Sequence, residues 1–260
     1  MMIIDFHAHV YPSRIADKAV HNVSRFYNIE VRCDGTAETL LEIGRRARID
    51  KFLIHSVAQK PEQIRNINNF IALQCEHNPD AFIGFGTLHI GAWNIAEEID
   101  NIIALGLKGV KLHPDIQGFY IDDERMMNIF SLLENRLPVL IHAGDYRYDY
   151  SHPSRIARVI DSFPKLTVIA AHFGGWSIFD LALEYLEHRF CYLDVSSSMM
   201  FLGNRRSEEL IRAYGANRIL FGSDYPMWDP ASELERFQSL NISNAEKDLI
   251  LSGNALKILS

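Results

Sequence analysis

Two histidines and an aspartate near the start of the chain alternate with apolar residues. In IIDFHAHVYP, Asp5, His7 and His9 are spaced two apart, so a strand here would carry all three on one face. Neutral imidazole nitrogens are good ligands for a divalent cation such as Zn²⁺, and His7 and His9 could both reach one ion. We expect Asp5 to lie deeper and orient these ligands, and Phe6 and Ala8 to pack against surrounding helices.

Several later apolar segments also end in a polar side chain that could do chemistry. They are GLKGVKLHP, LPVLIHAGD, LTVIAAHFGG and RILFGSDYP, which end near Lys111, His113, His142, His172 and Asp224. His142 and Asp224 would complete a metal shell begun by the two early histidines, with a position left for water. A bound divalent ion lowers the pKa of its water toward about 7, which supplies hydroxide at neutral pH. His55 and His89 end two other segments and receive no assigned role.

The elements that must bring these residues together are eight short apolar segments separated by helical patterns. The expected strands lie near Ile3–His7, Lys51–Val57, Phe82–Leu88, Leu107–His113, Pro138–His142, Thr167–His172, Cys191–Val195 and Ile219–Gly222. Strands that alternate with helices indicate a parallel sheet, and eight such units match a (β/α)₈ barrel of roughly 250 residues. We therefore predict one barrel domain over residues 1–260, in which the strand ends meet at one mouth.

One connection of the predicted barrel is unusually long. The segment Tyr11–Ile49 exceeds a plain connection between a strand and a helix, so we expect a loop and a helix over the barrel mouth. An open doubly wound sheet is the alternative fold. No GxGxxG motif follows the first strand, which removes its commonest nucleotide-binding form.

Composition excludes several classes of protein. The formal net charge is −7 with no lysine- or arginine-rich run, which argues against a nucleic-acid binder. Cys33, Cys75 and Cys191 are far apart and form no CxxC pair, so a disulfide framework is not expected. There is no signal-peptide pattern and no apolar run of about 20 residues. We expect a cytoplasmic protein that acts on a small molecule, and a homodimer is compatible with the sequence.

The ordered motifs DFHAHV, KLHP, IHAG, AHFGG, GSDYP and SGNALKIL resemble the amidohydrolase superfamily, and within it the amidohydrolase-related branch. The resemblance covers nearly the whole chain and implies a distorted (β/α)₈ barrel. That branch contains metal-dependent hydrolases and nonoxidative decarboxylases, such as aminocarboxymuconate-semialdehyde and resorcylate decarboxylases.

The resemblance implies a role for each matching residue. His7, His9, His142 and Asp224 match the metal ligands, and His172 matches a histidine that acts beside the metal on water or substrate. One divalent ion is implied, with Zn²⁺ expected first and Mn²⁺ second. Asp224 would take a proton from water, and His172 would polarise or orient the reacting group.

Four further residues are candidates for holding the substrate. Binuclear relatives bridge two metals with a carboxylated lysine on the fourth strand, but KLHP is more similar to the mononuclear branch, where this lysine lies near the substrate. Lys111, His113 and Arg147 would therefore hold an anionic part of the substrate. Trp228 would form a wall of the pocket.

The most direct functional reading is a metal-dependent hydrolase, and the chain is short beside typical decarboxylases of the branch. The alternative is nonoxidative decarboxylation of an aromatic or muconate-like acid that the metal chelates. A TatD-type nuclease shares an early HxH and a late Asp. Its fourth strand, however, is acidic and GEIGLD-like, whereas this chain has GVKLHP there. A non-catalytic metal-binding protein would need no complete ligand set together with His172.

Overall fold

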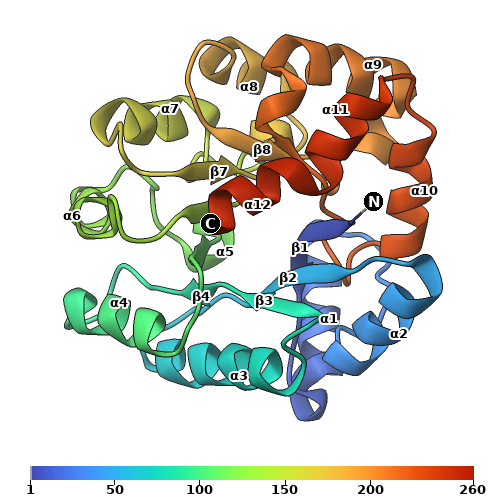
Figure 1. The fold of residues 1–260 in the computed structure, drawn as a ribbon. Helices are drawn as coiled ribbons and strands as arrows, with labels where there is room; N and C mark the ends of the chain where they lie inside the picture. Colours follow the sequence, from blue (N-terminus) through green and yellow to red (C-terminus); the bar gives the residue numbers. More distant parts are fainter. Residues whose placement is uncertain (1) are drawn as a thin grey trace.

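Within residues 2–260, which the computed structural model describes, nine parallel strands form a ring (Figure 1). They are β1 (Ile4–His9), β2 (Lys51–His55), β3 (Phe82–Gly84), β4 (Gly86–Thr87), β5 (Val110–Leu112), β6 (Val139–Ile141), β7 (Val168–Ala170), β8 (Tyr192–Asp194) and β9 (Ile219–Leu220). β1 to β3 form one sheet and β4 to β9 a second. All eight predicted strand segments are present, and Phe85 divides the third into β3 and β4. The predicted (β/α)₈ barrel is confirmed.

The ring closes between β9 and β1 through single backbone hydrogen bonds instead of a regular ladder. Phe6 N donates to Phe221 O at 2.8 Å, and Asp224 N donates to His7 O at 2.8 Å. An isolated bridge also pairs Ala8 with Tyr225. We call this junction the seam, and it is where the barrel departs from regular geometry.

Helices surround the ring, and the last of them crosses one of its ends (Figure 1). They are α1 (Ser13–Tyr27), α2 (Ala37–Ala47), α3 (Ile64–His77), α4 (Ile95–Ala104), α5 (Pro114–Gln117), α6 (Glu124–Leu133), α7 (Pro153–Ser162), α8 (Phe179–Leu186), α9 (Met199–Tyr214), α10 (Pro230–Gln238), α11 (Asn244–Asp248) and α12 (Asn254–Leu259). The segment Tyr11–Ile49 thus contains two helices where one was predicted. α1 ends at the barrel mouth, and α2 packs on the outside beside α10. Across the described residues, no helix is both long and apolar enough to cross a membrane.

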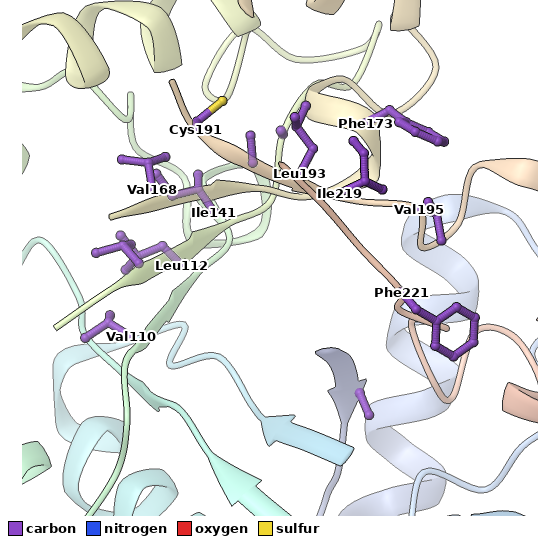
Figure 2. Close-up of a cluster of buried hydrophobic side chains, with 14 of the residues drawn as sticks. Val110, Leu112, Ile141, Val168, Phe173, Cys191, Leu193, Val195, Ile219 and Phe221 are labelled. Carbon is purple, nitrogen blue, oxygen red and sulfur yellow. The ribbon is translucent and has the colours of Figure 1, made fainter. Parts of the chain in front are cut away.

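Apolar side chains form one layer outside the ring and another inside it. Figure 2 shows part of the outer layer along β5 to β9, including Val110, Leu112 and Ile141. The inner layer consists of Ile4, Phe6, Leu53, Phe85, Leu140, Ile169, Ala171, Leu220 and Ala255. Because Ala255 belongs to α12, this helix closes the end of the barrel at which β1 begins. The polar side chains gather at the opposite end of the barrel, which is its mouth.

The first strand does not alternate as regularly as its sequence predicts. Its register with β2 pairs Asp5 with Phe52 and Ala8 with Ile54, so three steps along β1 match two along β2. This extra residue is a β-bulge, which changes the face on which the following side chains lie. Ala8 packs in the outer layer as predicted, but the prediction for Phe6 was wrong, because its ring lies inside the barrel, 5.8 Å from that of Phe85.

Candidate metal centre and active site

Six histidines form one cluster at the barrel mouth, and all of them except His9 are buried. They are His7, His9, His55, His113, His142 and His172. The His172 ring links two parts of the cluster, since its centroid lies 5.1 Å from that of His7 and 4.9 Å from that of His142. Strands far apart in sequence therefore bring their polar ends together, as the alternation of strands and helices predicts.

The His7 ring is fixed by contacts at both of its nitrogens. Nδ1 lies 2.8 Å from Asp194 Oδ2, and Nε2 lies 3.0 Å from Lys111 Nζ and 3.3 Å from Asp224 Oδ1. Since a carboxylate only accepts, Nδ1 carries the proton, and the Nε2 lone pair faces the centre of the mouth, where it accepts from Lys111 Nζ. Burial, and next the charge of Lys111, lower the pKa of His7 well below its usual value, so the imidazole stays neutral.

Asp224 lies between the two histidines of the first strand. Its Oδ1 is 3.3 Å from His7 Nε2 and 3.5 Å from His9 Nε2. Its Oδ2 accepts a hydrogen bond from Ser197, whose hydroxyl accepts one from Trp228 Nε1 at 2.7 Å. Trp228, predicted as a pocket wall, thus supports the carboxylate through Ser197. Burial raises the pKa of Asp224.

His142 and His172 are joined in a chain that fixes their tautomers. His172 Nδ1 lies 2.9 Å from Ser196 O, a carbonyl that only accepts, so this nitrogen carries a proton. With this proton on Nδ1, His172 can accept at Nε2 from His142 Nδ1, 3.0 Å away. His142 Nε2 is left with a free lone pair and is buried without a hydrogen-bond partner. This is the form in which an imidazole binds a metal ion.

His113 is engaged differently from the other histidines. Its Nδ1 accepts from the backbone N–H of Ile116 at 3.3 Å, so Nε2 carries the proton and donates to the Tyr27 hydroxyl at 2.7 Å. Its ring also stacks on that of His142, with centroids 3.8 Å apart. Tyr27 is the last residue of α1, so this contact anchors the end of that helix over the mouth.

Arg147, predicted to clamp a substrate carboxylate, already binds one within the protein. Its Nε and one terminal nitrogen contact the two oxygens of Asp145 at 2.9 and 2.6 Å. The other terminal nitrogen donates to Phe26 O, and the guanidinium lies 5.4 Å from the centre of the Tyr27 ring. In this structure Arg147 holds the end of α1 against the mouth.

Asp5 takes the supporting position that its depth in the strand suggests. Its Oδ1 accepts hydrogen bonds from the backbone N–H groups of Ser223 at 2.9 Å and His7 at 3.1 Å. Both contacts lie at the seam, close to Asp224 in the chain. Burial raises the pKa of Asp5 to about 7.

The cluster contains supporting residues that the sequence reading did not identify. Asp194 ends the apolar run CYLDV, and this position at the end of a strand is the signal that could have revealed it. Tyr27 carries no comparable signal, because its partner His113 lies 86 residues away on another element. Asp115, with Oδ2 3.5 Å from His142 Nε2, follows the KLHP motif directly.

The donors at the mouth are of the types that bind a divalent metal ion, although no single group among the described residues contains all four predicted ligands: His142 lies apart from His7 and His9, and Asp224 is in none of the groups. Among residues 2–260, the groups with ligand atoms within 4.8 Å of one another are His7–His9–His55, His7–His172–Asp194 and His113–Asp115–His142. Imidazole nitrogen and carboxylate oxygen are ligands that Zn²⁺ and its neighbours accept. The specific observation that supports metal binding is His142 Nε2, which is buried without a hydrogen-bond partner.

Comparison with known proteins agrees with this arrangement. A model of the amidohydrolase family matches residues 4–260. The chain belongs to the amidohydrolase family. This membership confirms the resemblance found in the sequence motifs.

One curated relative of this amidohydrolase-family chain is the 2-amino-3-carboxymuconate-6-semialdehyde decarboxylase of Dictyostelium discoideum. It is 26% identical over 237 residues, which cover 74% of this chain and 65% of the relative. The chain therefore spans less than two thirds of the length of that relative.

Solved structures show that the fold is shared. A TIM-barrel protein from Bordetella bronchiseptica has a TM-score of 0.78 at 23% identity, covering 100% of this chain and 98% of its own. The 5-carboxyvanillate decarboxylase of Sphingomonas paucimobilis has a TM-score of 0.75 at 18% identity, with coverages of 99% and 98%. A dihydroxybenzoic acid decarboxylase from Polaromonas, with bound manganese, has a TM-score of 0.75 at 17% identity, with coverages of 99% and 96%.

Proposed function

We propose that this amidohydrolase-family chain is a metal-dependent decarboxylase of a small aromatic or muconate-like acid. The observation that carries the proposal is Lys111, a fully buried amine 3.0 Å from His7 Nε2 at the centre of the mouth. A buried cation among neutral imidazoles suits a substrate that brings a carboxylate. The decarboxylases among the relatives favour this reading over the hydrolase predicted from the sequence. Lys111 also stands where a TatD-type nuclease would need a carboxylate.

The proposed ligands of one divalent ion are His7, His9, His142 and Asp224. Two observations support them: the lone pairs fixed at Nε2 of His7 and His142, and the closeness of Asp224 Oδ1 to His7 and His9. Zn²⁺ was the first expectation, and the manganese in the Polaromonas structure makes Mn²⁺ an equal candidate. When bound, the ion supplies a Lewis acid that withdraws electrons from substrate oxygens.

Asp224 is the proposed proton donor. The His7 side chain is fully buried, whereas those of Asp224 and His9 are 11% and 13% exposed, so an entering substrate meets Asp224. Asp224 would give a proton to the carbon that bears the carboxylate. The carbon–carbon bond then breaks, its electron pair returns to the unsaturated system, and CO₂ leaves.

The remaining residues bind, orient and exclude water. Lys111 Nζ would pair with the substrate carboxylate, and the His113 ring would border it. His172 orients His142 through their shared hydrogen bond. Tyr27 and Trp176, whose ring centroids are 5.1 Å apart, form an aromatic cover that limits water at the reacting carbon.

Two parallel assays on the metal-loaded protein test the proposed function. The protein is stripped, reloaded with Mn²⁺ or Zn²⁺, and supplied with 2,6-dihydroxybenzoate, 5-carboxyvanillate and 2-amino-3-carboxymuconate-6-semialdehyde. CO₂ release that disappears with EDTA and in Asp224→Asn is expected. A panel of lactones and amides is assayed beside them, and metal-dependent hydrolysis without any CO₂ release would establish the hydrolase instead.

The proposal also covers the class of substrate, the partners, the location and the assembly of the protein. We infer that the substrate is a small acid and that neither nucleic acid nor a membrane is a partner, because the chain has a net charge of −7 and no basic run. A cytoplasmic location and a homodimer complete this proposal. Sedimentation velocity measures the assembly, and fractionation of cells measures the location.

A further inference from the structure

We infer that His55 is an additional protein ligand of the metal centre beside His7 and His9. The inference rests on the proposed metal centre but not on the reaction carried out there. His55 is the last residue of β2, and the strand register pairs it with His9, the last residue of β1. Neighbouring strands thus deliver the two imidazoles to the same part of the mouth.

The His55 ring is buried without any hydrogen-bond partner. Its exposure is 0%, and neither Nδ1 nor Nε2 has a partner in the protein. A buried polar group is ordinarily paired, so two such nitrogens on one ring require an explanation. A neutral imidazole with no hydrogen bond at either nitrogen has one lone pair free to bind a metal ion.

The His55 ring lies close to the rings of His9 and His7. The His55 centroid lies 4.3 Å from that of His9 at an interplanar angle of 89°, and 5.0 Å from that of His7. One ligand atom from each of the three residues lies within 4.8 Å of the others. Small side-chain rotations would therefore let all three nitrogens share one ion.

The contrast with His113 shows why His55 is the better candidate. His113 also belongs to a group of donors within 4.8 Å, with Asp115 and His142. Both of its nitrogens are already used, one by the Ile116 backbone N–H and one by the Tyr27 hydroxyl. His55 has no such contacts, so binding a metal would cost it no existing hydrogen bond.

Metal affinity of a matched pair of variants tests this assignment. His55→Phe keeps an aromatic ring in place and removes both nitrogens. His89→Phe makes the same change just after β4, where the ring is half-buried and outside the histidine cluster. Dissociation constants for Mn²⁺ and Zn²⁺ are measured by competition with a chelator, and the visible spectrum of the Co²⁺-loaded protein reports the ligand field.

A direct ligand should matter more than a residue that only supports one. We expect His55→Phe to weaken binding by more than about 100-fold, the upper end for supporting residues, and to change the Co²⁺ spectrum. His89→Phe should retain wild-type affinity and spectrum. Unchanged affinity and spectrum in His55→Phe would overturn the inference and would assign His55 to ring packing on His9.

Wild-type protein provides a measurement that does not depend on the variant folding. In a crystal structure of the zinc-loaded chain, a His55 nitrogen about 2.1 Å from the metal supports the inference. A separation beyond about 3 Å refutes it. Wild-type protein that binds neither metal would refute the proposed function as well, whereas metal binding without His55 removes this inference alone.

Discussion

The Nδ1 of His7 lies 2.8 Å from Oδ2 of Asp194, and both side chains are completely buried. Asp194 Oδ1 accepts at the same time from the backbone N–H of His172 at 3.0 Å. The Asp194 carboxylate therefore orients His7, a proposed ligand, and also holds the backbone of His172. Such carboxylate–histidine pairs set the tautomer and raise the basicity of the ligating nitrogen.

Asp194→Asn should weaken metal binding without removing a ligand. The amide is neutral and can present its NH₂ group to His7, so the tautomer with a free Nε2 lone pair is no longer enforced. We expect a loss of roughly 10- to 100-fold in affinity for Zn²⁺, measured by chelator competition. Asp161→Asn, whose native carboxylate pairs with Arg189 on the surface, is the control. Equal affinities in the two variants would contradict the orienting role.

Lys111→Met should separate substrate binding from metal binding. The variant removes the buried cation while keeping an unbranched side chain of similar length. If Lys111 holds the substrate carboxylate, we expect a rise in KM of at least about tenfold, the equivalent of 1.4 kcal/mol, with metal content unchanged. Steady-state kinetics and metal analysis check this result. Loss of the metal in Lys111→Met would instead make the lysine part of the metal centre.

Arg147→Lys should loosen the end of α1. A lysine cannot reproduce the two contacts to Asp145 and the bond to Phe26 O. We expect faster hydrogen exchange in residues 24–28 and a higher KM, because Tyr27 loses its support.

The chain offers a matched control for that change. Arg125 contacts both oxygens of Asp123 with the same two-residue spacing, but its side chain is 64% exposed. Arg125→Lys should shift stability by less than about 0.5 kcal/mol and leave KM unchanged. Similar effects of the two substitutions would show that the Arg147 contacts are ordinary surface pairs.

The pH dependence of stability in the metal-free protein follows from the buried imidazoles. Burial lowers the pKa of five histidines well below 6.5, namely His7, His9, His55, His113 and His142. Below pH 6.5 the unfolded chain takes up protons that these folded imidazoles do not, so each lowers stability by up to about 1.4 kcal/mol per pH unit.

Four buried carboxyl groups oppose this trend. Burial raises the pKa of Asp5 to about 7 and that of Asp115 to about 6, and it raises the pKa values of Asp224 and Glu233 above their usual range. These groups bind protons more readily in the folded state, so their contribution is fully present at low pH and is lost as pH rises through their folded pKa. Five imidazoles outnumber them, and stability should fall from pH 6.5 to 5. Urea unfolding at fixed pH values measures this, and a flat or rising profile would contradict it.

Much of the fold could be predicted from sequence because most strands are short apolar runs that a polar residue ends or closely follows. The same signal identified His142, His172 and Asp224, and it was equally present at Asp194. The bulge after Asp5 could not be predicted, because one extra residue on a strand leaves no mark on its own alternation.

Contacts between elements that are far apart in the sequence could not be predicted either. Tyr27 approaches His113 at the end of α1, which Arg147 also contacts, and no periodicity describes that geometry. The second helix of Tyr11–Ile49 was missed for a related reason. Helical segments that leave the barrel mouth and return to its wall are positioned by tertiary packing.

The seam between β9 and β1 determines when the proposed metal site can form during folding. Asp224 N donates to His7 O, so the hydrogen bond that closes the ring also sets the first and last proposed ligands side by side. A nascent chain that has not yet added its ninth strand can have neither a closed wall nor this pair of ligands. Full-affinity metal capture should therefore coincide with completion of the barrel, and the ion would act as a checkpoint for a finished fold.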